Sequence, residues 1–214
     1  MNTHTVKALF FYAPGCVFCP QVHHVLEQLL AEQQLDSLDA INIAEDTRLA
    51  EQLGVRSVPW LKLNDIVLFG QHSEAELQRW VELSRQGTAN EHFILEQLES
   101  GQLQPVEDLL ARAPGVIQLF LKYLPDMSQS INVRLGISAL LEGLQGTELL
   151  ASIINDLGTL TQSEDVQVRA DACHYLGLSQ RTSARSFLQA ALEDENHEVR
   201  EIAEESLTML SEQA

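Results

Sequence analysis

Hydrophobic and polar residues follow two different patterns along this chain. Over the first 87 residues, short apolar runs alternate with segments whose apolar residues recur at helical spacing. This order predicts a β-α-β-α-β-β-α domain of mixed α/β class. The expected elements are strands at 6–12, 38–43, 60–63 and 66–69, and helices at 20–33, at 47–53 and after Ser73.

Two local signals support this order of elements. Asn64 and Asp65 separate two apolar runs and are typical of a two-residue hairpin. Ser73 is followed three residues later by Glu76, which is the pattern of a capping box at the start of a helix. The hairpin signal marks the end of the third strand and the start of the fourth, and the cap marks the start of the last helix of this domain.

The pattern changes after Gly87. Beyond it there is no strand signal, only amphipathic segments of roughly 10–15 residues, a usual length for globular helices. We therefore predict a mixed α/β domain at residues 1–87 and an all-helical domain at residues 88–214. The charge also differs: residues 1–88 carry a net charge of −5, and residues 89–214 carry −13, from 7 basic and 20 acidic residues.

The second half contains an internal repeat. A Val-Arg pair occurs three times, with the valines 35 and 31 residues apart, and each pair is predicted to open a helix. Apolar or small residues follow each valine at four and eight residues, which forms one buried face. The arginine points off that face and can bond a neighbouring helix end or an acidic turn residue. Repetition at this period predicts stacked helix pairs. The three sets are Val133, Ile137 and Leu141; Val168, Ala172 and Leu176; and Val199, Ala203 and Leu207.

Two of the three cysteines in the chain form a CxxC motif. Cys16 and Cys19 stand between the first predicted strand and the first predicted helix, so both can lie on one turn and close a disulfide. The helix N-terminus offers unpaired N–H groups and a partial positive charge, which favour a thiolate. Three cysteines do not make a secreted disulfide framework, and in a reducing compartment a CxxC is more often catalytic or metal-binding.

A metal site is the main alternative use of these cysteines. His23 completes a C-x2-C-x3-H spacing, one turn beyond Cys19, but no second CxxC or histidine pair supplies further zinc ligands. We therefore predict redox chemistry, with no metal and no organic cofactor. His23 is either a solvated or partly packed histidine or a residue that tunes Cys19. Cys173 is expected to be a small core residue.

Composition excludes several classes of function. The net charge of −18 argues against a basic surface for nucleic acid or for an anionic membrane. No apolar run is long enough to span a bilayer, and the N-terminus lacks the pattern of a secretory signal. A cytoplasmic protein is therefore expected.

The first domain resembles the thioredoxin superfamily, in particular its short glutaredoxin-like branch. The resemblance rests on the strand end before the cysteines, on Cys19-Pro20, and on the segment 54–59 that ends in Val58-Pro59. It implies that Cys16 attacks and Cys19 resolves, that Pro59 is cis, and that the Val58 backbone pairs with an extended substrate. The groove would be bordered by Tyr12, Trp60 and Gly70, although Trp60 is equally well explained as hairpin core.

Two positions depart from thioredoxins proper. Phe10 stands where those proteins carry a buried acid, and Ala40 stands where they carry a lysine. Proton transfer at Cys19 would therefore need water or another group.

The second half resembles HEAT-like repeats across residues 131–212, most closely at 164–177. That resemblance implies a scaffold that docks other proteins. Two functions follow. The first is a thiol–disulfide oxidoreductase whose repeats recruit protein clients bearing disulfides or thiols, served by a reductase or oxidant that the sequence does not name. The second is an interaction scaffold with a non-catalytic or redox-sensing thioredoxin-like domain.

Overall fold

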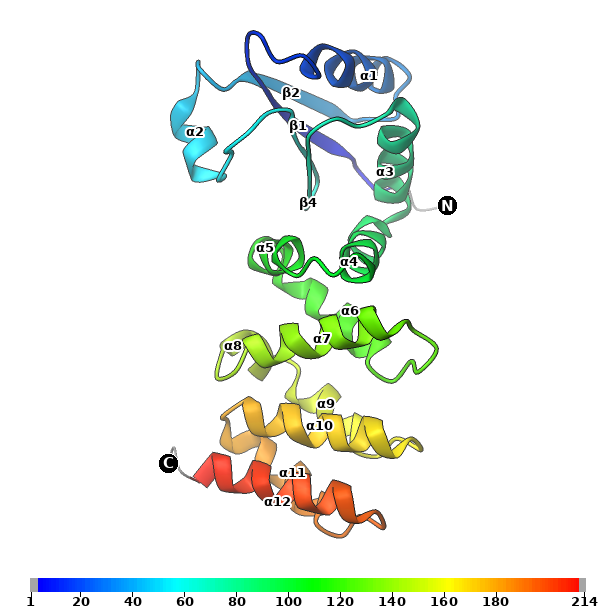
Figure 1. Cartoon of the computed structure of the whole chain (residues 1–214), viewed down its shortest axis with the longest axis vertical. Helices are drawn as coiled ribbons and strands as arrows, with labels where there is room; N and C mark the ends of the chain where they lie inside the picture. Colours follow the sequence, from blue (N-terminus) through cyan, green and yellow to red (C-terminus); the bar gives the residue numbers. More distant parts are fainter. Residues whose placement is uncertain (1–3, 212–214) are drawn as a thin grey trace. The chain divides into compact units, whose positions relative to one another are not determined.

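The computed structural model describes residues 4–211, and these form two compact units (Figure 1). The first unit ends at Glu96 and the second begins at Gln97. The first contains a mixed sheet and helices, and every helix of the second belongs to a helical array. The fold class predicted from the sequence, a thioredoxin-like α/β domain followed by all-helical repeats, is confirmed.

The sheet of the first unit has the order β2-β1-β3-β4. Strand β1 (Lys7–Tyr12) lies parallel to β2 (Ser37–Asn42) and antiparallel to β3 (Trp60–Leu63). Strand β4 (Ile66–Phe69) pairs antiparallel with β3 across the expected hairpin, where Asn64 has φ 50°. Because β3 runs antiparallel to β1, the C-terminal end of β1 and the start of β3 lie at the same end of the sheet.

Four helices accompany the sheet. Helix α1 (Cys19–Ala31) contacts α3 (Glu74–Gln86), and Figure 1 shows α2 (Thr47–Gln52) on the opposite side of the sheet from both. Ser73 and Glu76 form the predicted capping box at α3: hydrogen bonds from the Ser73 backbone and side chain lower the pKa of Glu76. The fourth helix, α4 (Ala89–Glu99), follows Gly87, which ends α3 in a left-handed conformation.

Alternating residues of β1 serve two cores. Phe10 is buried and faces away from Phe11, as neighbours on a strand do. Phe11 packs edge-on against Trp60, with ring centroids 5.6 Å apart, in a cluster that includes Ala50 of α2. The central strand is therefore held from both faces, which fixes where its end meets the cysteine motif.

Helix α4 begins beyond the boundary that the sequence predicts, and its first part belongs to the first unit. Phe93 packs edge-on against Trp80 of α3, with ring centroids 6.1 Å apart. Arg79 stacks on Trp80 and pairs with Glu96 at 2.9 Å. Gly87 thus ends a helix, whereas the compact unit continues to Glu96.

The second unit is an array of short helices joined by tight turns. Helices α7, α10 and α12 lie one above another in Figure 1, and α10 contacts both of the others. The helices beyond α4 are α5 (Gln104–Arg112), α6 (Ile117–Tyr123), α7 (Ile131–Gly143), α8 (Glu148–Ala151), α9 (Ile154–Leu160), α10 (Val166–Leu178), α11 (Arg185–Ala191) and α12 (His197–Ser211), with 3-10 turns at Pro114–Val116 and Thr182–Ala184.

The repeated valine is the third residue of α7, α10 and α12, as the sequence predicts for helix starts. Each helix is preceded by a capping side chain three residues before its valine: Ser130, Asp165 and Asn196 accept hydrogen bonds from backbone N–H groups of the first turn. The predicted face is buried in all three copies except at Leu207, which is half-buried.

The repeated arginine bonds to the turn that precedes its helix. Arg169 donates to the carbonyls six and five residues before it at 2.9 and 3.3 Å, and Arg200 makes the same two bonds at 2.6 and 3.0 Å. Arg169 also forms a two-point pair with Asp194 at 2.8 and 3.0 Å. The predicted bonding of the arginines to turns is therefore confirmed for two copies. Arg134 has no hydrogen bond or ion pair from its side chain within residues 4–211.

Candidate redox site at the start of helix α1

A tight turn carries the chain from β1 to the first cysteine. The N–H of Cys16 donates to the carbonyl of Ala13 at 3.2 Å, and Pro14 and Gly15 occupy the two central positions. Gly15 has φ 83°, the left-handed value that a type II turn requires at its third residue. This turn holds Cys16 just beyond the end of the central strand.

Cys16 and Cys19 form a disulfide, with an S–S distance of 2.09 Å and Cα atoms 5.5 Å apart. The structure therefore shows the oxidised form of the motif. Cys16 is half-buried, whereas Cys19 is only 3% exposed. The sequence predicts this difference, because Cys16 precedes the helix and Cys19 lies in its first turn.

The sulfur of Cys16 accepts a hydrogen bond at the helix start. The N–H of Cys19 points at Cys16 Sγ with a donor–acceptor distance of 3.1 Å. The N-cap residue, Phe18, has no side-chain oxygen to cap these N–H groups, and Pro20 has no N–H. After reduction, the same N–H and the helix dipole favour a thiolate on Cys16.

His23 lies one turn beyond Cys19 in a stack of three rings. Its imidazole is stacked on Phe10 and Tyr12, with ring centroids 5.7 and 5.8 Å apart, and its side chain is 34% exposed. Glu27 lies 3.8 Å from its Nε2. The ring is thus packed along the first helix, as the partly packed alternative expects, and its effect on Cys19 stays a prediction.

The two positions that depart from thioredoxins proper carry no ionisable side chain. Phe10 is fully buried, and Ala40 stands exposed on β2. Within residues 4–211, no three His, Cys, Asp or Glu side chains come together as metal ligands.

The Val58–Pro59 peptide bond is cis, as predicted. Pro59 precedes Trp60, which pairs with Phe11, so the register continued by one residue places Pro59 beside Tyr12. The Pro59 carbonyl accepts from the N–H of Gly70 at 2.9 Å. Within residues 4–211, neither the N–H nor the carbonyl of Val58 forms a hydrogen bond. Both groups are thus available to an extended peptide.

Trp60 does not border an open groove. It is 3% exposed and belongs to the core cluster beneath the hairpin, so the hairpin-core interpretation describes it. Tyr12, Val58 and Gly70 are half-buried and remain candidates for the border of the groove.

Sequence reasoning did not identify the two residues between the cysteines as a contact surface. Val17 is 83% exposed and Phe18 is 45% exposed. A signal was present: apolar residues in a tight strand-to-helix connection have no core beneath them to enter. Their exposure places uncharged side chains directly beside the disulfide.

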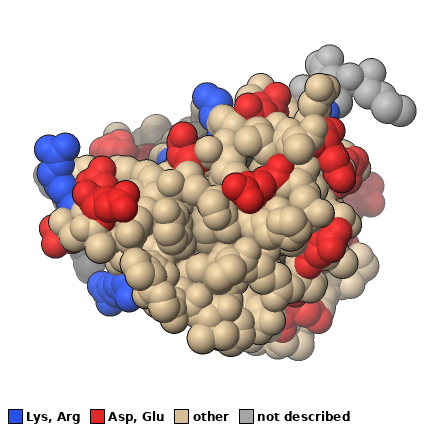
Figure 2. Space-filling model, turned by 90° about the horizontal axis from the view of Figure 1, so that it is seen from above, with Lys and Arg blue, Asp and Glu red and all other residues tan. Residues whose placement is uncertain are grey.

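Charged side chains are sparse over part of the surface. Figure 2 looks onto one face of the molecule and shows scattered acidic side chains, a broad uncharged area and a few Lys and Arg toward the margin.

Within residues 4–211, every helix is too short or too polar to cross a membrane.

These features define a class: a dithiol–disulfide site at a helix start, with a cis-proline beside the end of β1, on a thioredoxin-like fold followed by stacked helix pairs. Family comparison agrees with this class. Residues 6–82 match the model of a thioredoxin domain, and residues 117–208 match that of HEAT repeats. The chain therefore contains a thioredoxin-like domain followed by HEAT repeats. No curated protein matches it significantly.

Proposed function

We propose that the chain is a thiol–disulfide oxidoreductase that acts on protein clients, with the helical repeats as a docking element. The observation that carries the proposal is the Cys16–Cys19 disulfide at the start of α1, with the Cys19 N–H bonded to Cys16 Sγ. The unpaired Val58 backbone supports a client bound as an extended strand. The small number of cysteines favours a reducing compartment such as the cytoplasm as its setting.

The exchange needs two steps. In the reduced protein, the Cys16 thiolate attacks one sulfur of a client disulfide, a mixed disulfide forms, and the other client sulfur leaves as a thiolate that takes a proton from water. Cys19 then loses its proton to water and attacks Cys16 Sγ, which releases the second client thiol. Two electrons pass from the dithiol to the client, and the Cys16–Cys19 disulfide seen here is the product.

The cycle closes through a second partner. An external thiol reductant must reduce the Cys16–Cys19 disulfide before another client is reduced. Run in reverse, the same steps oxidise a client dithiol, and an external oxidant restores the disulfide. A redox titration of the Cys16–Cys19 pair against glutathione decides which direction is favoured.

A trapping experiment tests the proposal. Reduced Cys19→Ser protein is expected to form a stable mixed disulfide with insulin or with a small aromatic disulfide, because the resolving thiol is missing. Cys16→Ser is expected to form none, since Cys19 is buried. Mass spectrometry measures the adducts, and Cys173→Ser is the control that should behave as the native chain. Equal trapping by both single variants, or none by either, would contradict the proposal.

A further inference from the structure

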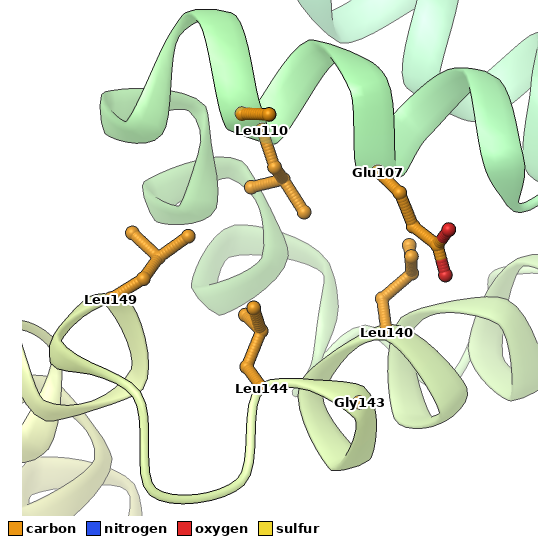
Figure 3. A pocket seen from close by; sticks show the side chains of 7 residues that line it. Glu107, Leu110, Leu140, Gly143, Leu144 and Leu149 are labelled. Atoms are coloured by element: carbon orange, nitrogen blue, oxygen red, sulfur yellow. The ribbon is translucent and has the colours of Figure 1, made fainter.

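The helical array contains an apolar pocket away from the cysteine motif. It lies between α5, α7 and α8, and four leucine side chains line it (Figure 3). Leu110 and Leu140 are buried and form its base, while Leu144 and Leu149 are half-buried. We call this the α5–α7–α8 pocket. All of its residues belong to the second unit, so its shape depends on that unit alone.

The size of the pocket indicates what can enter it. Its volume is about 220 Å³. Sites for small organic ligands usually begin at about 300 Å³, whereas an apolar cavity of about 150 Å³ accepts a benzene ring. The pocket therefore suits one side chain of the size of leucine or phenylalanine rather than a cofactor.

The pocket has one charged side chain at its rim. Figure 3 shows the carboxylate of Glu107 beside Leu140. The Glu107 carboxylate forms no hydrogen bond or ion pair within residues 4–211. The neighbouring carboxylates differ: Asp108 accepts from Gln104 at 3.1 Å, and Glu148 pairs with Arg181 at 2.7 Å. Glu107 is thus free to meet a cation that arrives with the apolar side chain.

We propose that the α5–α7–α8 pocket binds a phenylalanine or leucine side chain of a basic client segment, whose Lys or Arg pairs with Glu107. The inference rests on the docking role proposed for the repeats and names the chemistry of the segment they take. The net charge of the chain distinguishes two possible occupants of the pocket, a second copy of this chain and a basic segment of another protein. A second copy of this chain carries a net charge of −18 and is repelled, whereas a basic segment is attracted to an array whose charge is strongly negative.

Synthetic peptides test the proposal on the full-length chain. The probe is a short capped peptide with one phenylalanine between two lysines, followed through the leucine methyl signals in NMR spectra. We expect the signals of Leu110 and Leu140 to move on titration. A peptide with alanine in place of phenylalanine should bind about tenfold more weakly or worse, since the pocket stays unfilled. A peptide with glutamates in place of the lysines should also bind more weakly.

Matched variants separate the two parts of the site. Glu107→Gln should reduce the preference for lysine over glutamate peptides, and Asp108→Asn, which removes the same charge beside it, should reduce it less. Ala111 lines the pocket at an exposed position, so Ala111→Phe should block binding, while the same change at exposed Ala190 of α11 should not. Circular dichroism confirms that each variant is folded.

The outcomes are distinct from those of the redox proposal. Unmoved leucine signals, or equal affinity for lysine and glutamate peptides, would overturn the pocket's role. Exchange with a small disulfide is measured on the same samples and should be unchanged in Ala111→Phe. Peptide binding without any exchange activity would leave the pocket in place and reject the oxidoreductase.

Discussion

The three cysteines of the chain lie in three different environments. Cys16 is half-buried just before α1, Cys19 is buried in the first turn of α1, and Cys173 is fully buried in α10. Burial raises the pKa of the Cys173 thiol to about 11, so this thiol stays protonated at neutral pH. Position in the fold therefore separates one accessible thiol from two protected ones.

This difference predicts the order of alkylation in the reduced protein. Iodoacetamide at neutral pH should modify Cys16 first and Cys19 more slowly, and it should reach Cys173 only when the second unit unfolds. Peptide mapping by mass spectrometry at several times measures the order, with a sample in denaturant as the control. Labelling of Cys19 ahead of Cys16 would reverse the roles assigned to the two thiols.

The ring stack at His23 predicts a contrast between adjacent histidines. His23→Ala loses the stacking on Phe10 and Tyr12 and should lower the free energy of unfolding by about 1 kcal/mol. His24→Ala is the matched control, because His24 is exposed and its loss should cost less than about 0.5 kcal/mol. Urea unfolding followed by tryptophan fluorescence compares the two. Equal losses of unfolding free energy in the two variants would mean that the ring stack does not stabilise the fold.

At the scale of helices, Arg169 and Arg200 hold the starts of α10 and α12 to the turns before them. Arg169→Ala removes the two bonds to carbonyls and leaves Asp194 without its partner, so the second unit should lose about 3 kcal/mol of stability. Arg134→Ala is the matched control in the first copy and should cost less than about 1 kcal/mol. Thermal unfolding followed by circular dichroism measures both. A comparable loss in Arg134→Ala would contradict this role of the arginine.

The same pair predicts how the stability of the array depends on pH. Hydrogen bonds from Arg169 lower the pKa of Asp194 below its usual 3.8. A carboxylate with a lowered pKa stabilises the fold fully above the unfolded pKa, and that contribution disappears as the pH falls from there through the folded pKa. When the pH falls below about 4, the free energy of unfolding should therefore decrease more in the native protein than in the Arg169→Ala variant. If the free energy of unfolding falls equally steeply with pH in both proteins, the Arg169–Asp194 pair is not the cause of the pH dependence.

The helices also show how far sequence reasoning reaches. The strands, the capping box and the valine face follow from local patterns, so residues such as Ser73, Asn64 and Val168 mark their elements directly. Trp60 and α4 could not be placed that way. Whether Trp60 faces a groove or a core depends on α2 packing beneath the hairpin. The first part of α4 belongs to the first unit, where Phe93 contacts Trp80, and no sequence spacing encodes that contact. In the site, the cis bond and the thiol roles followed from family resemblance, but the exposed Val17 did not.

At the scale of the whole molecule, the two units should be separable at the end of α4. A chain ending at Glu99 keeps Phe93 on Trp80 and should fold and exchange with a small disulfide. A chain ending at Thr88 loses this contact and should be less stable by about 3 kcal/mol. Both tryptophans, Trp60 and Trp80, are buried in the first unit, so their fluorescence reports its unfolding alone. Equal stability of the two truncated chains would place the boundary at Gly87 instead.

The caps of the last two repeats, Asp165 and Asn196, lie 31 residues apart, and this spacing determines what a deletion of that length does to the helix start. Removal of residues 166–196 joins Asp165 directly to His197. Asp165 then stands three residues before Val199, where Asn196 stood, and Arg200 lies five and six residues after Glu164 and Ser163, whose carbonyls Arg169 holds at present. The cap and the arginine bonds are thus restored by the deletion itself. Loss of these 31 residues is therefore expected to keep this helix start intact.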